Sequence, residues 1–541
     1  MAKKILYNED AQKALQNGVN TVAECVKVTL GAKGNFVGLD RDYGSPLITN
    51  DGVTIAKEVV LSDEFENMGA KLVCEASSKT NSDSGDGTTT AIVLAQALVN
   101  NGLGCVANGV NPVLIKKGME QAVDNVVEYI KEHAIPVRGA DDIAKIATIS
   151  SRDEQFGKII ADIIEKMGND VVITVEESHT GNTEYEIVKG LQFDKGYVAP
   201  HMVTDVEKMI CEYDNPLILI TDQKITNIQD ILPILEEVSK SGRALLIISD
   251  EMSNEVMGTL IQNKLRGVLN VVCVKPPKFG EMREAWLEDI AALTGGVFIN
   301  SKHGMALKDI ETHHLGSAQK IKVDKDTTTI IGGTNNPDII QNRVSSIRAE
   351  LEKATSEFDK EKLKERIAKL TGGVAVIRVG ASTEVEMKDK KLRLEDALAA
   401  TRAAIDEGIV PGGGIALLNA CDELQRNKIY DYAEDYLAGN EIVIKALQEP
   451  FKNIVENAGC DYKELYSTYT ANKGKKPHCY IKNCGFDVMT NSFVDMIENG
   501  IIDPAKVTRT ALQNALSVAT MIISTKVLIS EDKETKEEKR I

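Results

Sequence analysis

A short stretch rich in glycine and threonine holds the residue types best suited to bind a phosphate group. In Gly85-Asp86-Gly87-Thr88-Thr89-Thr90, two glycines flank an acid, and the apolar run at 92–99 that follows predicts a helix. A turn that leads into a helix start offers unpaired backbone N–H groups to an anion. The hydroxyls add donors, and the Asp86 carboxylate can hold a metal ion against phosphate oxygens. The GxxxxGK[ST] pattern of a Walker loop is absent, and a plain turn with a threonine helix cap remains the alternative.

Two more acids lie near predicted turns. Asp51 belongs to Asn50-Asp51-Gly52, and turn chemistry alone explains an acid before a glycine. Asp396 lies in Leu394-Glu395-Asp396-Ala397, where we expect a helix to begin and to run to about Glu407. Negative charge in a first helical turn suits the helix dipole. Each acid therefore has a structural explanation beside a catalytic one.

The elements that must position these residues change in type along the chain. From about 190 to 374, short apolar runs alternate with helical stretches, which predicts an α/β domain with a mostly buried sheet. The ends of the chain are predicted to be largely helical, with a possible exception for the polar stretch at 466–483. Helical periodicity covers 8–30, 64–81, 91–132, 141–150, 153–167 and 338–370, and short strands are expected at 36–39, 47–49, 171–175, 185–188 and 374–379.

Two helices of the α/β region carry slightly more apolar residues than a narrow stripe. Asp230 is expected to cap the first of them, which has Pro233 in its first turn, and the second spans about 256–265. Two amphipathic helices that cover a sheet explain this pattern. Methionine, here Met257, also suits an adaptable binding surface, so a binding role stays open.

Composition limits the classes of partner. The chain has 541 residues, enough for two or three domains, and a formal net charge of -18 with 4% aromatic residues. An acidic chain repels nucleic acid and anionic membranes, so we expect neither as a partner. The first residues lack the apolar core of a signal peptide, and we expect no apolar run of the ~18 residues that a membrane helix needs.

Nine scattered cysteines without a CxxC pair resemble neither a disulfide framework nor a zinc site. Reduced thiols in a cytoplasmic protein are the simplest explanation. His478, Cys479 and Cys484 come nearest to a metal cluster, but a fourth ligand at suitable spacing is missing.

Seven motifs taken together resemble the group I chaperonins, the GroEL family, and they occur in that family's order. The resemblance runs from about residue 3 to about residue 529. The motifs are Thr29-Leu30-Gly31-Ala32-Lys33-Gly34, Asn50-Asp51-Gly52-Val53, Gly85 to Thr90, Thr327-Thr328-Thr329-Ile330-Ile331, Leu394 to Ala397, Gly412-Gly413-Gly414 and Asp503-Pro504-Ala505-Lys506-Val507-Thr508-Arg509.

The resemblance implies a multidomain α and α/β fold with three domains. A mostly α equatorial ATPase domain would combine 1–132 with 407–541, and the charged C-terminal tail would follow it. A small α/β intermediate hinge domain would combine 133–188 with 375–406. The α/β apical domain, 189–374, would bind clients and the lid.

The function implied by the resemblance is that of an ATP-dependent molecular chaperone. Subunits of this family form heptameric rings, often stacked in pairs, that capture non-native polypeptides on an apolar rim. Hydrolysis of ATP with Mg²⁺ drives their enclosure under a GroES-type co-chaperonin lid.

Individual roles also follow from the resemblance. Asp86 would bind Mg²⁺, Asp51 and Asp396 would orient the attacking water, and Thr29 and Thr89 would lie near a K⁺ ion. The other implied nucleotide contacts are Leu30, Gly31, Ala32, Asn50, Gly87, Thr88, Thr90, Gly413, Asp487, Val488, Met489 and Asp503. The implied client and lid contacts are Tyr197, Leu232, Leu235, Met257 and Ile261.

Several positions depart from the family's pattern. Asn50 replaces a usual lysine, and His201 and Gln262 stand where apolar or aromatic residues are usual. The segment 460–484 is longer than the family norm, and a charged tail replaces the usual Gly-Gly-Met repeats. A drifted paralogue that acts as a binding or scaffold protein is therefore the alternative. A small-molecule kinase is a more remote one, because no substrate motif accompanies the nucleotide loops.

Overall fold

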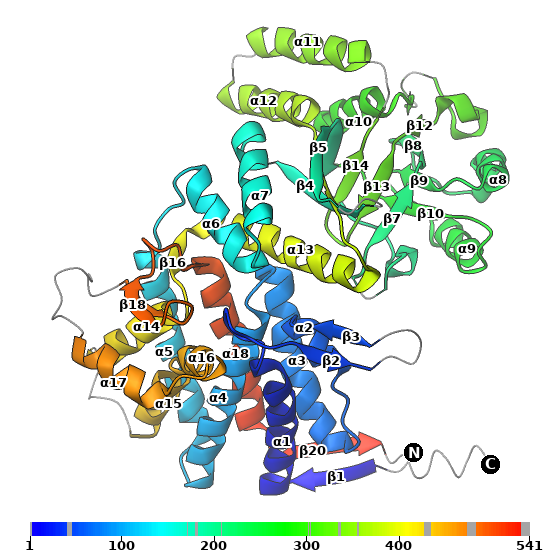
Figure 1. The fold of residues 1–541 in the computed structure, drawn as a ribbon. Coiled ribbons are helices and arrows are strands. Elements are labelled where there is room, and N and C mark those ends of the chain that lie inside the picture. The colour runs from blue at the N-terminus through cyan, green and yellow to red at the C-terminus, as the bar shows by residue number, and fades with distance from the viewer. Residues whose placement is uncertain are drawn as a thin grey trace. The chain divides into compact units, whose positions relative to one another are not determined.

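The first and last described strands of the chain pair with each other. In the computed structural model, β1 (Lys3–Tyr7) runs antiparallel to β20 (Val527–Glu531), with Ile5 opposite Ile529 (Figure 1). Both ends of the chain therefore belong to one folded unit. Composition and periodicity gave no sign of this pairing.

The structure describes residues 3–40, 46–169, 171–178, 182–206, 208–300, 302, 304–333, 337–353, 356–426, 434–472 and 483–531. The chain divides into two compact units, of which the first comprises 1–169, 177–183 and 379–541, and the second 170–176 and 184–378. The boundaries predicted for three domains stay predictions. The possible metal ligands His478 and Cys479, and the tail beyond 531, lie outside the described residues.

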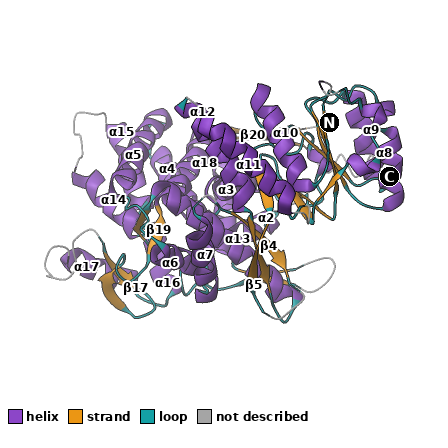
Figure 2. Ribbon diagram, turned by 90° about the horizontal axis from the view of Figure 1, so that it is seen from above, coloured by secondary structure: helices purple, strands orange, loops and turns teal. Residues whose placement is uncertain are grey.

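The first unit consists mainly of helices, drawn in purple in Figure 2. Those before the insertion of the second unit are α1 (Asn8–Lys27), α2 (Gly52–Glu58), α3 (Glu64–Ser84), α4 (Thr88–Ala107), α5 (Pro112–His133), α6 (Ala140–Ser151) and α7 (Glu154–Met167). Those after it are α13 (Glu384–Glu407), α14 (Ile415–Arg426), α15 (Glu434–Ala446), α16 (Glu449–Asn457), α17 (Tyr462–Asn472) and α18 (Ala505–Ser524).

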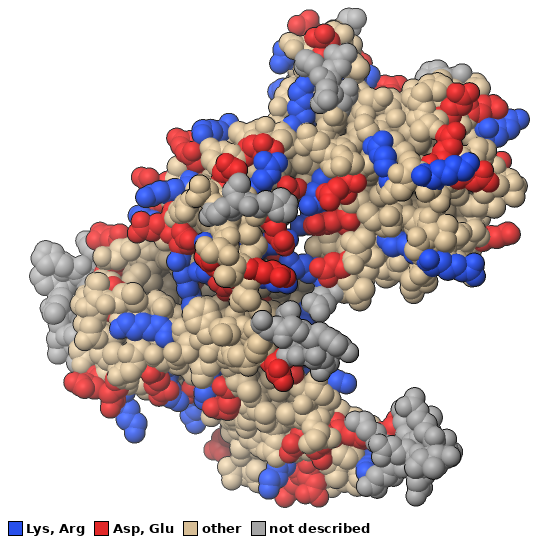
Figure 3. Space-filling model, turned by 45° about the vertical axis from the view of Figure 1, so that its right-hand side comes forward, with Lys and Arg blue, Asp and Glu red and all other residues tan. Residues whose placement is uncertain are grey.

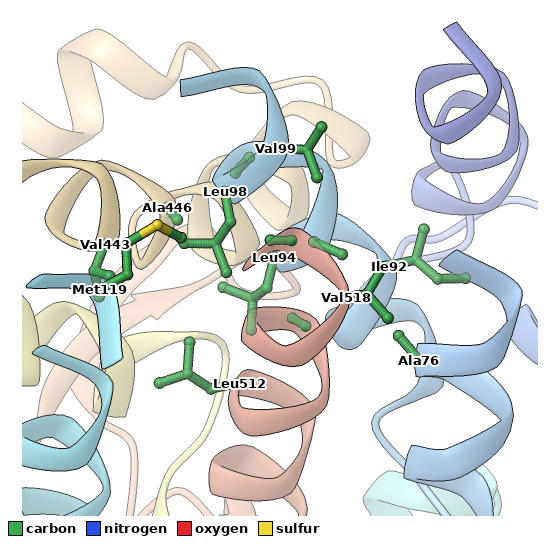
Figure 4. Close-up of a cluster of buried hydrophobic side chains, with 14 of the residues drawn as sticks. Ala76, Ile92, Leu94, Leu98, Val99, Met119, Val443, Ala446, Leu512 and Val518 are labelled. Carbon is green, nitrogen blue, oxygen red and sulfur yellow. The ribbon is translucent and has the colours of Figure 1, made fainter. Parts of the chain in front are cut away.

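The core of this unit joins helices from both ends of the chain. Figure 4 shows Leu94 and Leu98 of α4 among side chains of α18, α5 and α15, such as Val518, Met119 and Val443. All five of these side chains are buried, so the hydrophobic effect favours a unit that includes both ends.

Short strand pairs connect the helices of the first unit. They are β2 (Val37–Leu39) with β3 (Leu47–Thr49), β16 (Ile409–Pro411) with β19 (Ile502–Pro504), and β17 (Cys484–Asp487) with β18 (Ser492–Asp495). The strands after residue 408 correct the expectation of a helical C-terminal part.

The second unit is the predicted α/β region. Its main sheet has parallel strands in the order β10-β9-β8-β11, with β12 antiparallel to β8, and a second sheet has the order β6-β14-β13-β7. The strands are β6 (Gly190–Phe193), β7 (Cys211–Asp214), β8 (Leu217–Thr221), β9 (Leu245–Ile248), β10 (Val271–Val274), β11 (Phe298–Ile299), β12 (Gly316–Ser317), β13 (Lys320–Val323) and β14 (Thr328–Ile331). Strands β8, β9 and β10 are buried along their whole length, as their unbroken apolar sequence predicts.

Helices and a third sheet complete the second unit. The helices are α8 (Leu232–Ser241), α9 (Asn254–Leu265), α10 (Gly280–Thr294), α11 (Pro337–Lys353) and α12 (Glu357–Gly372), and the sheet consists of β4 (Val172–Glu177), β15 (Val374–Val379) and β5 (Glu184–Val188). Asp289 of α10 is almost fully buried and accepts hydrogen bonds from Arg343 of α11 and Arg366 of α12, so one carboxylate connects three helices.

Two predicted helix starts are wrong. The helix expected from Leu394 begins ten residues earlier, at Glu384, where Thr383 caps it. Asp396 therefore lies in the middle of α13, and the dipole of a first turn does not explain it. Asp230 ends a short 3-10 helix rather than capping α8, whose N-cap is Ile231.

The helix after the glycine- and threonine-rich stretch corrects another expectation. Among the described residues, α4 is the one helix long and apolar enough to cross a membrane by length and composition, although no such run was expected. Packing inside the first unit explains its composition, since 56% of its most apolar window is buried.

Acidic and basic side chains are interspersed on the face of the molecule in Figure 3.

Candidate functional site

One cavity in the first unit brings together every residue predicted to contact nucleotide. It has a volume of about 830 Å³, and separate segments of the chain between Thr29 and Ala511 contribute to its lining. The predicted residues in that lining are Thr29, Leu30, Gly31, Ala32, Asn50, Asp51, Asp86, Gly87, Thr88, Thr89, Thr90, Asp396, Gly413, Asp487, Val488, Met489 and Asp503. The geometry places them together, while their individual roles stay predictions.

The start of α4 forms a donor-rich wall of this cavity. Gly87 is the N-cap, in a left-handed backbone conformation with φ 83°, and no side chain caps the helix. The alternative of a threonine cap is therefore wrong, because Thr88, Thr89 and Thr90 form the first turn itself. The first N–H groups of a helix lack partners within it, and a bound anion would satisfy them.

Gly52, at the start of α2, packs closely against the hydroxyls of this wall. A Cβ atom added to Gly52 would lie 2.5 Å from Thr89 Oγ1 and 3.1 Å from Thr88 Oγ1. Any larger residue at the start of α2 would therefore displace the hydroxyls of α4. Thr89 Oγ1 also lies 3.4 Å from Thr29 Oγ1, which brings two hydroxyl oxygens together where K⁺ was predicted.

Asp86 lies at the junction of α3, α4 and α6. Its Oδ1 accepts a hydrogen bond of 2.5 Å from Gly87 N–H, and its Oδ2 accepts one of 3.1 Å from Ser150 Oγ. Burial raises the pKa of the Asp86 carboxyl, and the negative charge of Asp51 raises it further. A divalent cation would favour the ionised form again, so the carboxylate suits a metal that bridges to phosphate.

No metal site is formed by protein ligands alone in the part of the chain that the structure describes, since no three His, Cys, Asp or Glu residues group there. Magnesium sites at nucleotides commonly use one or two carboxylates, substrate phosphates and water. The donor set around Asp86 therefore fits Mg²⁺ that arrives with a nucleotide.

Asp51 has the structural role that its turn suggested, within the same cavity. It is the N-cap of α2 and accepts hydrogen bonds from Val53 N–H at 3.2 Å and from Thr54 N–H at 3.0 Å. The Thr54 hydroxyl donates a third bond of 2.5 Å to its Oδ2. These bonds fix the carboxylate in one orientation, which a group that positions water also requires.

Asp396 reaches the cavity from α13, together with two charged residues that sequence reasoning missed. Asp389, Arg393 and Asp396 recur at spacings of four and three residues, so one face of the helix presents all three. Arg393 Nη2 donates a 2.5 Å hydrogen bond to Asp389 Oδ2. A helix that starts at Glu384 would have predicted this face.

Part of the cavity's lining is apolar. Ile454, Phe486, Met496 and Ile501 line it beside Gly413, a surface that suits a planar base. Asp503 also lines the cavity, and burial together with the charge of Asp86 raises its pKa to about 7. The Asp487 carboxylate accepts hydrogen bonds from Met489 N–H and Thr490 Oγ1, which shape the turn after β17.

Sequence reasoning also missed the end of α6. Ser150 and Arg152 line the cavity, and Arg152 Nη2 donates to the carbonyl oxygens of Thr29 at 3.3 Å and Gly31 at 3.2 Å. In the sequence, the break between two predicted helices at 151–152 was the sign that could have drawn attention to these residues.

The predicted client surface lies in the second unit and is partly buried. Leu235 keeps 9% of its surface exposed and belongs to the core, and Tyr197, Leu232, Met257 and Ile261 are half-buried. Larger apolar exposure occurs at the end of α9, where Leu265 is 71% exposed, and at Val268, which is 55% exposed. His201 and Gln262 are both exposed.

Comparison with known proteins gives a single picture. Residues 22–533 match the family model described as the TCP-1/cpn60 chaperonin family. The fold is similar to the crystal structure of the chaperonin gp146 from the bacteriophage EL 2 (Pseudomonas aeruginosa), determined in presence of ATP-BeFx. That comparison has a TM-score of 0.67 and 22% sequence identity, and it covers 98% of this chain and 99% of the other.

Proposed function

Because this chain belongs to the TCP-1/cpn60 chaperonin family, we propose that it is an ATP-dependent folding chaperone. It would assemble into rings, heptameric and single or paired. Non-native polypeptides would bind to the apolar surface of the second unit and be enclosed under a GroES-type co-chaperonin, and the protein would work in the cytoplasm. Hydrolysis of ATP would drive the cycle.

The observation that carries this proposal is the convergence of Asp51, Asp86 and Asp396 on one cavity beside the uncapped start of α4. Phosphoryl transfer to water needs a bound phosphate, neutralised charge and a nucleophile held in line. The N–H groups and hydroxyls of α4 serve the first need. The three acids, which come from different elements, suit the other two.

The residues divide the work as follows. Asp86 would hold Mg²⁺, which when bound would neutralise phosphate charge. Asp51, fixed by its three hydrogen bonds, and Asp396 orient the attacking water. The apolar part of the lining near Gly413 accepts the base, and Asp503 accepts hydrogen bonds from the ribose hydroxyls. The hydroxyls of Thr29 and Thr89 would hold K⁺.

The substitution Asp396→Ala tests the hydrolytic role. We expect ATP binding to stay within about twofold of the wild type, and turnover to fall by about 10²- to 10⁴-fold, since loss of a positioned acid or base costs that much. Binding titrations and a phosphate-release assay measure the two quantities. Glu384→Gln, an exposed acid on the same helix, is the matched control. Unchanged turnover in Asp396→Ala would contradict the role of Asp396.

A binding or scaffold protein without efficient folding activity is the second candidate, because the exposed His201 and Gln262 make the predicted rim more polar. Refolding of a denatured client, with ATP and with or without a lid protein, separates the two. ATP hydrolysis without rescue of the client would favour the scaffold. Negative-stain microscopy of the same samples would give ring symmetry and ring number.

A further inference from the structure

Arg152 has a left-handed backbone conformation that is uncommon for an arginine. It is the C-cap of α6 and has φ 57° and ψ 29°, in the left-handed region. Glycine or asparagine usually ends a helix in this conformation, because a side chain at Cβ is strained there. A long cationic residue at such a position suggests that its side chain has a function, since strain of this kind gathers at functional sites.

The guanidinium of Arg152 reaches the phosphate end of the cavity. One nitrogen, Nη2, donates to the carbonyl oxygens of Thr29 and Gly31, in the turn that faces α4. These bonds are 3.3 and 3.2 Å long, and the side chain remains exposed. A small rotation would therefore exchange weak backbone contacts for a contact with a ligand.

Arg152 and Arg393 place two positive charges near each other. Packing around the Arg152 guanidinium and the charge of Arg393 lower the pKa of Arg152, whereas Asp86 and Asp389 oppose that change. The carboxylates of Asp86 and Asp389 offset part of the repulsion between the two arginines. A bound polyphosphate would add further negative charge near both of them.

The two arginines have different roles. Arg393 is anchored through Nη2 to Asp389 and through Nη1 to the carbonyl oxygen of Ser151, at 3.5 Å. Arg393 therefore helps to fix the end of α6, where Arg152 is the C-cap. Arg152, by contrast, is held through backbone carbonyls alone among the hydrogen bonds of the described residues.

We propose that Arg152 turns from the carbonyls of Thr29 and Gly31 to the terminal phosphate of a bound nucleoside triphosphate, and stabilises the negative charge that develops during its transfer to water. This inference rests on the proposed function. Arg152 then acts as an arginine supplied by the same chain to the reacting phosphate, a position from which arginine stabilises phosphoryl transfer in other nucleotide hydrolases.

The step itself is ordinary hydrolysis. The oxygen of water forms a bond to the terminal phosphorus, and the bond from that phosphorus to the bridging oxygen breaks, with its electron pair leaving on ADP. The products are ADP and inorganic phosphate, and one proton of the water passes to solvent. Arg152 donates hydrogen bonds to the phosphoryl oxygens and exchanges no proton, because guanidinium stays charged.

Steady-state hydrolysis by the full chain with Mg²⁺ tests the proposal. We expect Arg152→Ala to lower kcat by about 100-fold or more, since preorganised charge of this kind has such effects. The affinity for ADP should stay within twofold, whereas the affinity for ADP with beryllium fluoride should fall at least tenfold. Arg152→Lys should recover less than a tenth of the lost rate, because it lacks the planar fork.

Two further variants separate this role from a structural one. Arg152→Gly removes the side chain and suits the left-handed backbone, so its melting temperature should equal or exceed that of the wild type while its kcat falls as in Arg152→Ala. Arg138→Ala, an exposed arginine outside the cavity, should hydrolyse ATP like the wild type.

Wild-type kcat in both Arg152→Ala and Arg152→Gly would overturn the role of Arg152 and leave the proposed function standing. Equal losses of affinity for ADP and for ADP with beryllium fluoride would also overturn it, because they would place the contact away from the terminal phosphate. A wild-type chain that hydrolyses no ATP would overturn the proposed function, and this inference with it.

Discussion

At the scale of single residues, the cavity holds one carboxyl, that of Asp503, whose ionised form lowers the free energy of unfolding. Burial and the charge of Asp86 raise the pKa of Asp503 to about 7, well above the value of about 3.9 for an unfolded chain. The folded protein therefore binds a proton more tightly than the unfolded one between about pH 4 and pH 7. The free energy of unfolding falls as the pH rises through this window, and the ionised carboxylate costs stability above it.

The substitution Asp503→Asn removes this cost. We expect it to stabilise the protein by about 2–4 kcal/mol at about pH 8 and by almost nothing at about pH 4, because the wild-type carboxyl is protonated there. Urea unfolding at both pH values measures the difference. Asp124→Asn, an exposed acid on α5, should change neither. A stability gain that is equal at both pH values would contradict the pKa explanation.

Some residues of the cavity could be predicted from their types alone, whereas others depend on where the helices begin and end. Asp86 and the three threonines were predicted because glycine and threonine at a helix start suit phosphate, and the structure places all four in the lining of one cavity. Arg152 and Arg393 were missed because their place in the lining depends on where α6 ends and where α13 begins. A helix start set at Leu394 instead of Glu384 hid the face that Arg393 shares with Asp396.

At the scale of elements, the buried carboxylate of Asp289 holds α10, α11 and α12 together. Asp289→Asn should destabilise the second unit by about 3–5 kcal/mol, because Arg343 and Arg366 would keep charges without a full partner in a buried setting. Thermal unfolding followed by circular dichroism measures the loss.

Glu288→Gln is the matched control, since Glu288 also pairs with Arg343 but is 42% exposed at its side chain. It should cost less than about 1 kcal/mol. Equal losses in the two variants would mean that burial does not set the strength of this network.

Elements with an unbroken pattern were also easier to predict than isolated pairs. The buried strands β8, β9 and β10 follow directly from their apolar runs, and β15 begins and ends at the predicted residues. The short strands β16, β17, β18 and β19 were missed because three or four residues carry too little periodicity to distinguish a strand from a loop. The pairing of β1 with β20 depends on contacts across the whole chain, which no local pattern records.

At the scale of the whole molecule, the second unit is nearly continuous in sequence, whereas the first unit needs both ends. The fragment 170–378 should therefore fold alone, with a single cooperative transition within about 5 °C of its transition in the full chain. The fragment 1–169 should stay largely unfolded, because the core around Leu94 lacks α15 and α18.

Circular dichroism and calorimetry of both fragments check these outcomes. The substitution Asp289→Asn, introduced into 170–378, should lower its unfolding free energy as it does in the full chain. A fragment 1–169 with a cooperative transition of its own would show that the shared core is not required.

Because β1 pairs with β20, the first unit cannot be completed on the ribosome until the last described strand has been made. At about 5–20 residues per second, the chain takes roughly half a minute or more to make, and the second unit can emerge and fold while the final strands are still missing. The cavity takes lining residues from Thr29 as well as from Asp503 and Ala511, so its walls come together near the end of synthesis. A product released early by the ribosome would keep the apolar surface of the second unit but lack a complete cavity. The lining of the cavity is thus complete only once the chain has been translated as far as Ala511.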